Sequence, residues 1–278
     1  MKKNKLKVAL IQMDVGPDRE KNLAKTHHLI DSAARKKPDI ICLPELFSYM
    51  GSFHNSKSVA ESKSGPSLTL IKELAVKHRT YIVAGSILEK TAKGLPKNTC
   101  YTVSPKGKIL SSYSKMHLFD IHVPGKIRFN ESNSMQPGKS ATILKTPFGK
   151  IGFAICNDIR YPELFRKMVL AGAEIIFLPA AFTKFTGRKH WIALNKVRAI
   201  ESQCYVIAVN QSVKNVDGVR FFGASLASDP WGKILCEGPA KGDTILTCTI
   251  NMSDLRKIRQ HLPALEKIHK SYRVKTVS

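Results

Sequence analysis

The chain has 278 residues, of which 43% are hydrophobic and 24% are charged, a balance typical of globular proteins that bury a substantial core. Lysine and arginine number 45 against 21 aspartates and glutamates, so the formal net charge is +24. The apolar runs are much shorter than the ~20 residues that a membrane-spanning helix needs, and none of the 6 cysteines belongs to a CxxC pair. The sequence therefore predicts no membrane span and no zinc or disulfide framework.

The N-terminus and the cysteines indicate the compartment. The first residues are basic, but the apolar run behind them is interrupted at Gln12 and Asp14 and is too short for a signal peptide. Without an export signal, the thiols are expected to stay reduced. We therefore expect a cytoplasmic protein in which most cysteines are small buried hydrophobic residues.

Hydrophobic periodicity and turn residues divide the chain into strands and helices. Strands are expected at 7–13, 39–43, 81–88, 99–104, 108–114, 141–145, 151–155, 174–178, 205–210, 225–228, 233–236 and 244–250. Helices are expected at 22–36, 67–77, 160–171, 190–202 and 253–260. Turn signals such as Pro105-Lys106-Gly107 join several of the strands as hairpins.

β-α-β passages thus alternate with runs of hairpins. This arrangement predicts an α/β protein with large mixed sheets and with helices on the outside. The sequence has no repeat with a period of ~20–50 residues, no low-complexity segment and no obvious linker. We expect a single domain over residues 1–278.

Two charged residues stand where apolar strands end. Glu45 follows strand 39–43, and a carboxylate at the C-terminal end of a buried strand is well placed for a functional site. Lys115 follows strand 108–114, and a lysine drawn into a cleft could supply a fixed positive charge. Taken singly, the glutamate could cap a helix and the lysine could be solvated at the surface.

Cys156 stands at a strand-to-helix elbow. There it would meet the positive end of the helix, which favours the thiolate, and the N–H of Asn157 could receive a developing oxyanion. Taken singly, it could also be an ordinary packed cysteine. A free thiol has a pKa of about 8.5 and needs a base and a nearby cation to attack a carbonyl. Glu45 could be that base and Lys115 that cation.

Other reactive sites have weaker support. A Cys–His pair could use His54, His117, His122 or His190 as its base, but no cysteine carries a papain-like or caspase-like signature. The chain has no Gly-x-Ser-x-Gly elbow, no phosphate-binding loop and no His-Glu-x-x-His motif. His117 and His122 could ligate a metal, but two histidines in a loop are a weak signal. We therefore expect no metal.

The three segments together resemble the signature blocks of the nitrilase superfamily, also called the carbon–nitrogen hydrolases. The blocks are 43–45, 114–119 and 155–163, and they carry Glu, Lys and Cys in that order. The resemblance covers nearly the whole chain, from residue 8 to residue 259. Within the superfamily, three segments resemble the branch of omega-amidases and deaminated-glutathione amidases. They are 117–132, 182–191 and 229–232.

The resemblance implies a four-layer α-β-β-α sandwich, paired as a homodimer or assembled into a larger homo-oligomer, without a metal or an organic cofactor. It implies that Cys156 is the nucleophile, that Glu45 is the base and that Lys115 helps to bind the tetrahedral intermediate. It also implies that Glu131 orients Lys115 or the substrate. Asn157 stands where the branch commonly has tyrosine, a difference that concerns the substrate more than the reaction.

We therefore expect a cysteine-dependent amidase that converts a small carboxylate-bearing amide, such as 2-oxoglutaramate, to an acid and ammonia. The positive net charge fits an anionic substrate, and Arg128, Lys184 and Arg188 are candidates to bind its distal carboxylate. Deaminated glutathione or an N-carbamoyl compound is an alternative substrate. A nucleic-acid-binding protein on a hydrolase scaffold is an alternative of another class, although the lysines and arginines form no dense tract. No membrane partner is expected.

Overall fold

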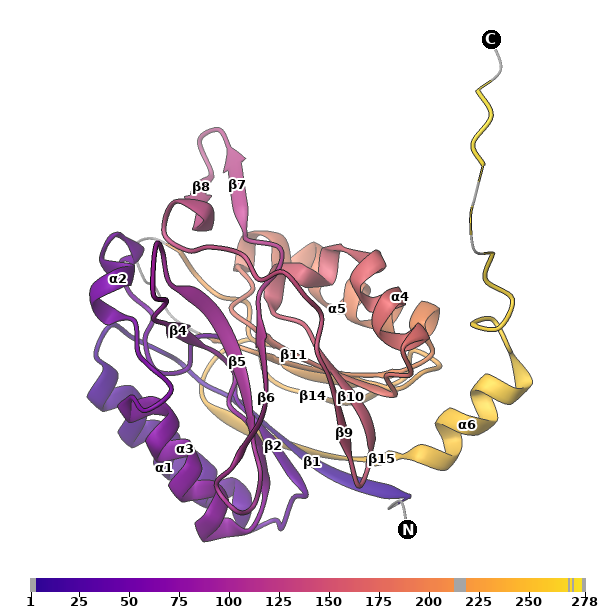
Figure 1. Ribbon diagram of the computed structural model, residues 1–278, viewed down its shortest axis with the longest axis horizontal. Helices are drawn as coiled ribbons and strands as arrows, with labels where there is room; N and C mark the ends of the chain where they lie inside the picture. The colour runs from indigo at the N-terminus through magenta and orange to yellow at the C-terminus, as the bar shows by residue number, and fades with distance from the viewer. Residues whose placement is uncertain (1–3, 213–218, 270, 272, 277–278) are drawn as a thin grey trace.

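The computed structural model describes residues 4–212, 219–269, 271 and 273–276. Two large β-sheets pack face to face, and helices cover the outer face of each sheet (Figure 1). These four layers are the predicted α-β-β-α sandwich. Within the described ranges, no helix has both the length and the apolarity to cross a membrane.

The first sheet comes from the N-terminal half of the chain and one late strand. Its strands are β1 (Lys5–Gln12), β2 (Ile40–Cys42), β3 (Tyr81–Val83), β4 (Ile87–Glu89), β5 (Lys97–Val103), β6 (Ile109–Ser114) and β15 (Thr244–Asn251). Their order is β15-β1-β2-β3-β5-β4, and β6 pairs with β5. Two helices, α1 (Arg19–Ala34) and α3 (Pro66–His78), connect the parallel strands β1, β2 and β3 and cover them from outside (Figure 1).

The second sheet comes from the C-terminal half. Its strands are β9 (Ile143–Thr146), β10 (Gly149–Phe153), β11 (Ile175–Ala180), β12 (Tyr205–Asn210), β13 (Leu226–Ser228) and β14 (Ile234–Glu237), paired in the order β14-β13-β12-β11-β10-β9. Helices α4 (Pro162–Leu170) and α5 (Lys184–Ser202) connect the parallel strands β10, β11 and β12. The remaining elements are α2 (Ser56–Val59), α6 (Met252–His261), the hairpin of β7 (Asp120–Val123) and β8 (Ile127–Asn130), and three short 3₁₀ helices, Phe53–Asn55, Glu131–Asn133 and Cys156–Arg160.

Alternate residues of β1 belong to two different cores. Leu6, Val8 and Leu10 join the core that includes the inner faces of both sheets, whereas Ala9 and Ile11 join the core beneath α1 and α3. Because both faces of the strand are buried, its sequence is nearly continuous in apolar residues. The same double burial explains why the central strands of both sheets could be recognised from the sequence.

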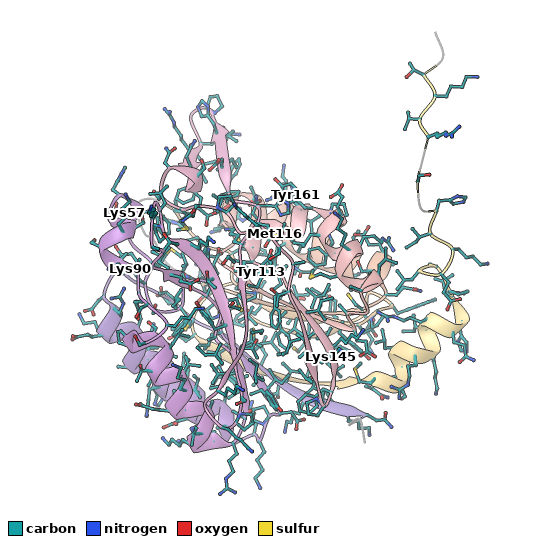
Figure 2. The ribbon with its side chains drawn as sticks, viewed as in Figure 1. Lys57, Lys90, Tyr113, Met116, Lys145 and Tyr161 are labelled. Carbon is teal, nitrogen blue, oxygen red and sulfur yellow. The ribbon has the colours of Figure 1, made fainter. Side chains whose placement is uncertain are left out.

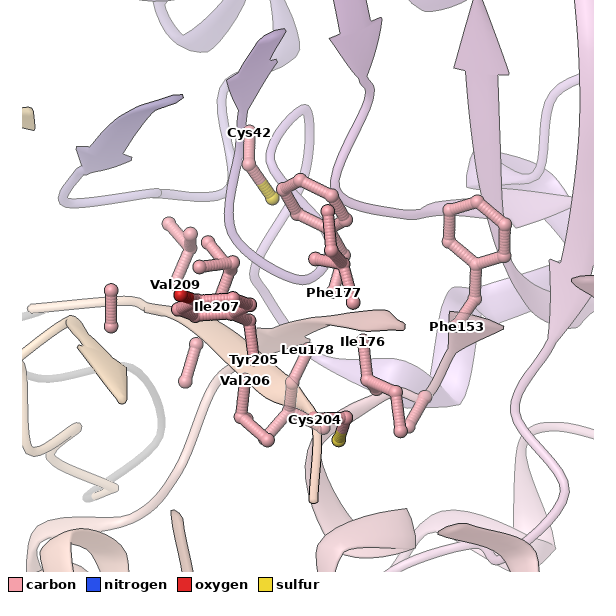
Figure 3. Close-up of a cluster of buried hydrophobic side chains, with 14 of the residues drawn as sticks. Cys42, Phe153, Ile176, Phe177, Leu178, Cys204, Tyr205, Val206, Ile207 and Val209 are labelled. Carbon is pink, nitrogen blue, oxygen red and sulfur yellow. The ribbon is translucent and has the colours of Figure 1, made fainter. Parts of the chain in front are cut away.

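The core between the sheets sets their relative position. Figure 3 shows part of it, with Cys42 of the first sheet drawn together with residues of the second sheet, among them Phe153, Phe177, Ile207 and Val209. All five side chains are buried. Any group attached to an end of these strands is therefore held against the opposite sheet by close packing.

The expected strand 81–88 is two strands, β3 and β4, separated by a turn. Gly85 in this turn has φ +49°, and a Cβ on it would lie 1.9 Å from the carbonyl oxygen of Pro44. The turn approaches the chain directly before Glu45, and Ser86 Oγ accepts a hydrogen bond from the N–H of Leu46 at 2.9 Å. The prediction of one strand was wrong because a continuous apolar run hides a turn that serves a tertiary contact.

Two helices have other starting points than the sequence predicted. The expected helix 160–171 is α4, which begins at Pro162, a residue favoured in the first helical turn. The expected helix 190–202 is α5, which begins six residues earlier at Lys184. Its N-cap is Thr183, whose side chain accepts from the N–H of Thr186.

The hairpin of β7 and β8 was not predicted. Its two strands pair only with each other, and it projects from the edge of the sandwich (Figure 1). Every residue of both strands is exposed or half-buried. Apolar residues do alternate along both strands, at Ile121, Val123, Ile127 and Phe129, but each run is only four residues long and none of these residues is fully buried, so the signal was overlooked.

Gly85→Ala should destabilise the protein by about 2–4 kcal/mol, because alanine is strained at this φ and its methyl group would clash with the Pro44 carbonyl. Urea unfolding would measure the loss. The matched control is Gly242→Ala, since Gly242 has φ +87° but nothing within 4 Å of an added Cβ. It should cost only the conformational strain, about 1–2 kcal/mol. Equal losses in the two variants would contradict the close approach at Gly85.

Candidate active site

Glu45, Lys115 and Cys156 line one cavity of about 650 Å³. The first two follow β2 and β6 of the first sheet, and the third follows β10 of the second sheet. All three side chains are buried, and only 2% of the surface of Lys115 is exposed. The structure thus brings together three residues that are 70 and 41 positions apart in the sequence.

Lys115 lies between two carboxylates. Its Nζ donates to Glu45 Oε1 at 2.9 Å, and it lies 3.0 Å from Oε1 and 2.8 Å from Oε2 of Glu131. Asn98 Nδ2 donates to Glu45 Oε1 at 2.7 Å. Burial alone lowers the pKa of Lys115, but the charges of Glu131 and Glu45 outweigh it and hold the pKa well above its usual value. Lys115 is therefore a permanent cation in a fixed position.

Glu131 begins the 3₁₀ helix that follows β8, and only 3% of its surface is exposed. Its Oε2 accepts from the N–H of Phe119 at 2.6 Å. Burial and the nearby charge of Glu45 raise the pKa of Glu131, and the Lys115 ammonium offsets only part of that rise. Glu131 contacts Lys115 directly, and its expected role of orienting Lys115 or the substrate stays a prediction.

Glu45 is held by groups of the second sheet. Its Oε2 accepts from the N–H of Ala181, directly after β11, at 2.7 Å. Its backbone carbonyl accepts from Gln211 Nε2, directly after β12, at 2.7 Å. The carboxylate is therefore fixed between the lysine of its own sheet and an N–H of the opposite sheet.

Cys156 has φ 47°, a left-handed conformation that is strained for any residue except glycine. The predicted elbow is present, but it leads into a 3₁₀ helix of five residues instead of a long α-helix, so the partial charge at its start is small. The predicted lowering of the thiol pKa was wrong. Burial, and next the charge of Glu45, raise the pKa of Cys156 well above its usual value, and the Lys115 ammonium opposes only part of this. At rest, Cys156 is a thiol that needs a base.

Asp158 ties the segment that carries the lysine to the turn that carries the cysteine. Its Oδ2 accepts from the Tyr113 hydroxyl at 2.7 Å and from the N–H of Ile155 at 2.8 Å. Its Oδ1 accepts from the N–H of His117 at 3.0 Å and lies 2.7 Å from that residue's Nδ1. The His117 ring stacks on Tyr161 with centroids 3.6 Å apart. Tyr113 and Tyr161, at the two ends of this network, are labelled in Figure 2.

Asn157 supports the same junction with its side chain. Its Nδ2 donates to the carbonyl of Leu118 at 3.0 Å, and its Oδ1 accepts from Arg160 Nε at 3.0 Å. The side chain thus binds neighbouring loops and is not among the groups that line the catalytic cavity. Its backbone N–H lies in the first turn of the 3₁₀ helix, where no helical acceptor is available. The expected oxyanion donor is therefore a backbone group.

The three basic candidates do not share one place. Arg128, in β8, lines the catalytic cavity. Lys184 and Arg188, at the start of α5, line a second cavity and do not line the catalytic one. The sequence placed all three at one carboxylate, because it gave no sign that α5 begins as early as Lys184.

Asn98 and Asp158 are site residues that the sequence analysis did not select. Asn98 lies within β5, where a buried polar residue looks like any outward-facing strand position until its partners are known. Asp158 stood inside the third signature block, and its position two residues after Cys156 was the available signal. Both act by holding the groups that line the cavity.

The histidines that were candidates for a Cys–His pair have other contacts. His117 contacts Asp158, and His190 contacts Arg160 at 3.1 Å. His54 is exposed at the rim of the catalytic cavity. Among the described residues, no three His, Cys, Asp or Glu side chains are grouped to hold a metal ion. The metal-free reaction stays a prediction.

Comparison with known sequences shows that residues 7–260 match the family model of the carbon-nitrogen hydrolases. The chain is 35% identical over 261 residues to the omega-amidase NIT2 of Mus musculus, covering 94% of each chain. It is 34% identical over 262 residues to a deaminated glutathione amidase of Synechocystis, covering 93% of this chain and 96% of the relative.

Comparison with solved structures finds proteins of the same fold. The NitFhit protein of C. elegans superposes with a TM-score of 0.90 at 31% identity, over 96% of this chain but only 66% of that longer one. Nit3 of Saccharomyces cerevisiae, a member of branch 10 of the nitrilase superfamily, superposes with a TM-score of 0.84 at 30% identity, over 94% of this chain and 95% of that one.

Asp158→Asn should destabilise the protein by about 2–4 kcal/mol, because an amide cannot accept from donors on both sides and would leave buried N–H or O–H groups unpaired. Urea unfolding would measure the loss. Asp229→Asn is the matched control, because that carboxylate also accepts from two backbone N–H groups, but at an exposed turn where asparagine is well tolerated. A loss at Asp158 as small as at Asp229 would show that the network is not needed for the fold.

Proposed function

The chain belongs to the carbon–nitrogen hydrolase family, and from this premise we propose that it is an amidase whose nucleophile is Cys156. As a member of the family it is a hydrolase of carbon–nitrogen bonds other than peptide bonds, of the omega-amidase type. One observation carries the assignment of residues. Cys156 lines the same buried cavity as Glu45 and Lys115, near enough that both charges shift its pKa.

In the first half-reaction, Glu45 takes the proton of the Cys156 thiol, and the thiolate attacks the amide carbonyl carbon. This transfer moves one negative charge from the carboxylate to the sulfur, so the total charge of the buried site does not change. Lys115 and the backbone N–H of Asn157 hold the oxyanion of the tetrahedral intermediate. Glu45 then gives its proton to the leaving nitrogen, ammonia departs and a thioester remains.

In the second half-reaction, Glu45 accepts a proton from water, and the hydroxide attacks the thioester carbonyl. The acid leaves, the proton returns to the sulfur, and Cys156 is again a thiol. The raised pKa of the thiol supports this cycle, because a thiolate with a high pKa is a strong nucleophile once its proton has been removed. The bonds of Lys115 and Ala181 to Glu45 fix the base within the cavity that Cys156 also lines.

The substrate we propose is a terminal amide that carries a carboxylate, with 2-oxoglutaramate as the first compound to assay. Arg128 lines the cavity and can face such a carboxylate. The cavity is also lined by Phe53, Phe119 and Phe129, and edge and tilted contacts join Phe129 to the other two rings. These rings can pack against the carbon chain of the substrate.

We further propose a homodimer or a larger homo-oligomer that acts in the cytoplasm. Large apolar side chains remain exposed on or beside α4 and α5, namely Tyr161, Leu170, Val197, Ile200 and Trp231. A second copy of the chain could cover this face. All six cysteines are free thiols in the structure, as a reducing compartment would keep them.

Cys156→Ala should reduce kcat by a factor on the order of 10⁴ or more with the fold retained, because no other group can form the thioester. Ammonia release from 2-oxoglutaramate and other terminal amides would measure it. Cys236→Ala is the control, since Cys236 is half-buried and distant from the cavity lining. If Cys156→Ala keeps more than about a tenth of the activity, another residue is the nucleophile.

Lys115→Met should reduce kcat by about 10²–10³-fold and change KM much less, because the lost charge stabilises the tetrahedral intermediate more than the bound substrate. Lys115→Arg should not restore the rate, because the planar guanidinium cannot take the place of an ammonium enclosed by two carboxylates. Steady-state kinetics on one good amide would measure both. A raised KM with unchanged kcat, partly restored by arginine, would make Lys115 a substrate anchor instead.

A further inference from the structure

A second cavity, of about 470 Å³, adjoins the catalytic cavity. Ile127, Thr183 and Val219 line both. The rest of the second lining is dominated by cations: Lys126, Lys184, Arg188, Lys189 and Arg220. We call this second cavity the basic vestibule. The two cavities therefore share part of their lining.

Three separate segments build the vestibule. Lys126 stands at the turn of the β7–β8 hairpin, and its Nζ lies 6.0 Å from the ring centroid of Phe185 in α5. Lys184, Arg188 and Lys189 occupy the first two turns of α5. The segment at Arg220 is joined to α5 because its carbonyl accepts from the N–H of Lys184. The cations are therefore gathered by the fold and not by their proximity in sequence.

The charges in the vestibule are of one sign. None of the described residues that line it is acidic. The first turn of α5 contains no acidic residue, and the helix N-terminus adds a partial positive charge. Arg188 lowers the pKa of Lys184, and Lys241 and Arg220 act in the same direction. Like charges so close together repel each other, and a bound anion would relieve that repulsion.

One carboxylate does not require such a surface. A single arginine can bind a carboxylate through two hydrogen bonds, and Arg128 is already available in the catalytic cavity. A catalytic cavity of about 650 Å³ is also in the range that holds drug-sized ligands, larger than a five-carbon monoamide. The space and the charge both exceed what 2-oxoglutaramate would use.

We infer that the basic vestibule binds a doubly negative group, such as a phosphate or phosphonate, at the end of the substrate remote from the scissile amide. This inference rests on the proposed amidase activity and extends it to a class of substrate, a terminal amide joined by a carbon chain to a dianion. The chain lies along the shared wall of the two cavities. Lys184 and Arg188 then contact the dianion, while Arg128 remains with the part of the substrate nearer the amide.

The experiment compares linear terminal amides of stepwise increasing length, each prepared with a methyl, a carboxylate or a phosphonate group at the far end. At one chain length kcat/KM should be highest for the phosphonate, by roughly tenfold over the methyl-ended amide, and added salt should reduce this ratio. In the double variant Lys184→Gln/Arg188→Gln, the ratio of kcat/KM for the phosphonate amide to kcat/KM for the methyl-ended amide should fall by roughly tenfold. We call this the phosphonate-to-methyl ratio.

Lys145→Gln is the matched control. Lys145 is exposed on β9, on the opposite side of the molecule from the β7–β8 hairpin (Figures 1 and 2). It should keep the wild-type phosphonate-to-methyl ratio. If Lys145→Gln lowers the ratio as much as the double variant does, the overall positive charge is responsible and the vestibule is not a binding site.

Calorimetry with Cys156→Ala tests the inference without turnover. The phosphonate amide should bind at least roughly tenfold more tightly than its methyl-ended counterpart, and the difference should disappear when Lys184 and Arg188 are also changed to glutamine.

Equal binding of the two amides would overturn the inference, while hydrolysis of the methyl-ended amide would leave the amidase proposal intact. If the phosphonate amide binds selectively but no amide is hydrolysed, the proposed function fails and the vestibule stands. Displacement of the phosphonate amide from the vestibule by a short oligonucleotide, but not by inorganic pyrophosphate, would assign the cations to nucleic acid and also overturn the inference.

Discussion

A buried lysine between two buried carboxylates is the interaction on which the site depends. Removing an ammonium from water is costly, and the cost is recovered only when opposite charges and hydrogen bonds surround it closely. Here Glu45 and Glu131 supply both, and Asn98 of β5 donates to Glu45. The group of three charges is net negative by one, which makes the environment unfavourable for a resting thiolate and favourable for a thiol with a base beside it.

The sequence allowed the layers and the three reactive residues to be predicted because each had a local signal. Strands buried on both faces are continuous in apolar residues, and Glu45 and Cys156 each follow such a strand. Lys115 follows β6, a partly exposed strand that the hairpin turn signal before it helped to locate. The split of strand 81–88 had no such signal, because Gly85 is needed for a contact with Pro44 that only the folded chain creates.

The parts that could not be predicted depend on distant partners. The β7–β8 hairpin has a half-buried face that packs at the catalytic cavity and only four-residue alternating runs. Helix α5 begins where Thr183 caps it, six residues before the expected start. For that reason the sequence grouped Lys184 and Arg188 with Arg128, whereas the fold places them in the adjoining cavity. The thiol pKa of Cys156 was predicted from an α-helix, but the cysteine begins a 3₁₀ helix of five residues, and burial with the charge of Glu45 raises the pKa.

The bonds that hold Glu45 also have a consequence for how the molecule reaches its working state. The N–H of Ala181 lies 136 residues from Glu45 in sequence, and the side chain of Gln211 lies 166 residues away. Contacts of such long range form slowly, because the chain entropy of large loops must be lost before the contacts stabilise anything. A partly refolded chain whose second sheet has not docked would hold Glu45 and Lys115 beside Glu131 and Asn98, but without the N–H of Ala181 and the side chain of Gln211. Activity in this fold therefore reports on the docking of the two sheets, and it would return only after the second sheet has packed on the first.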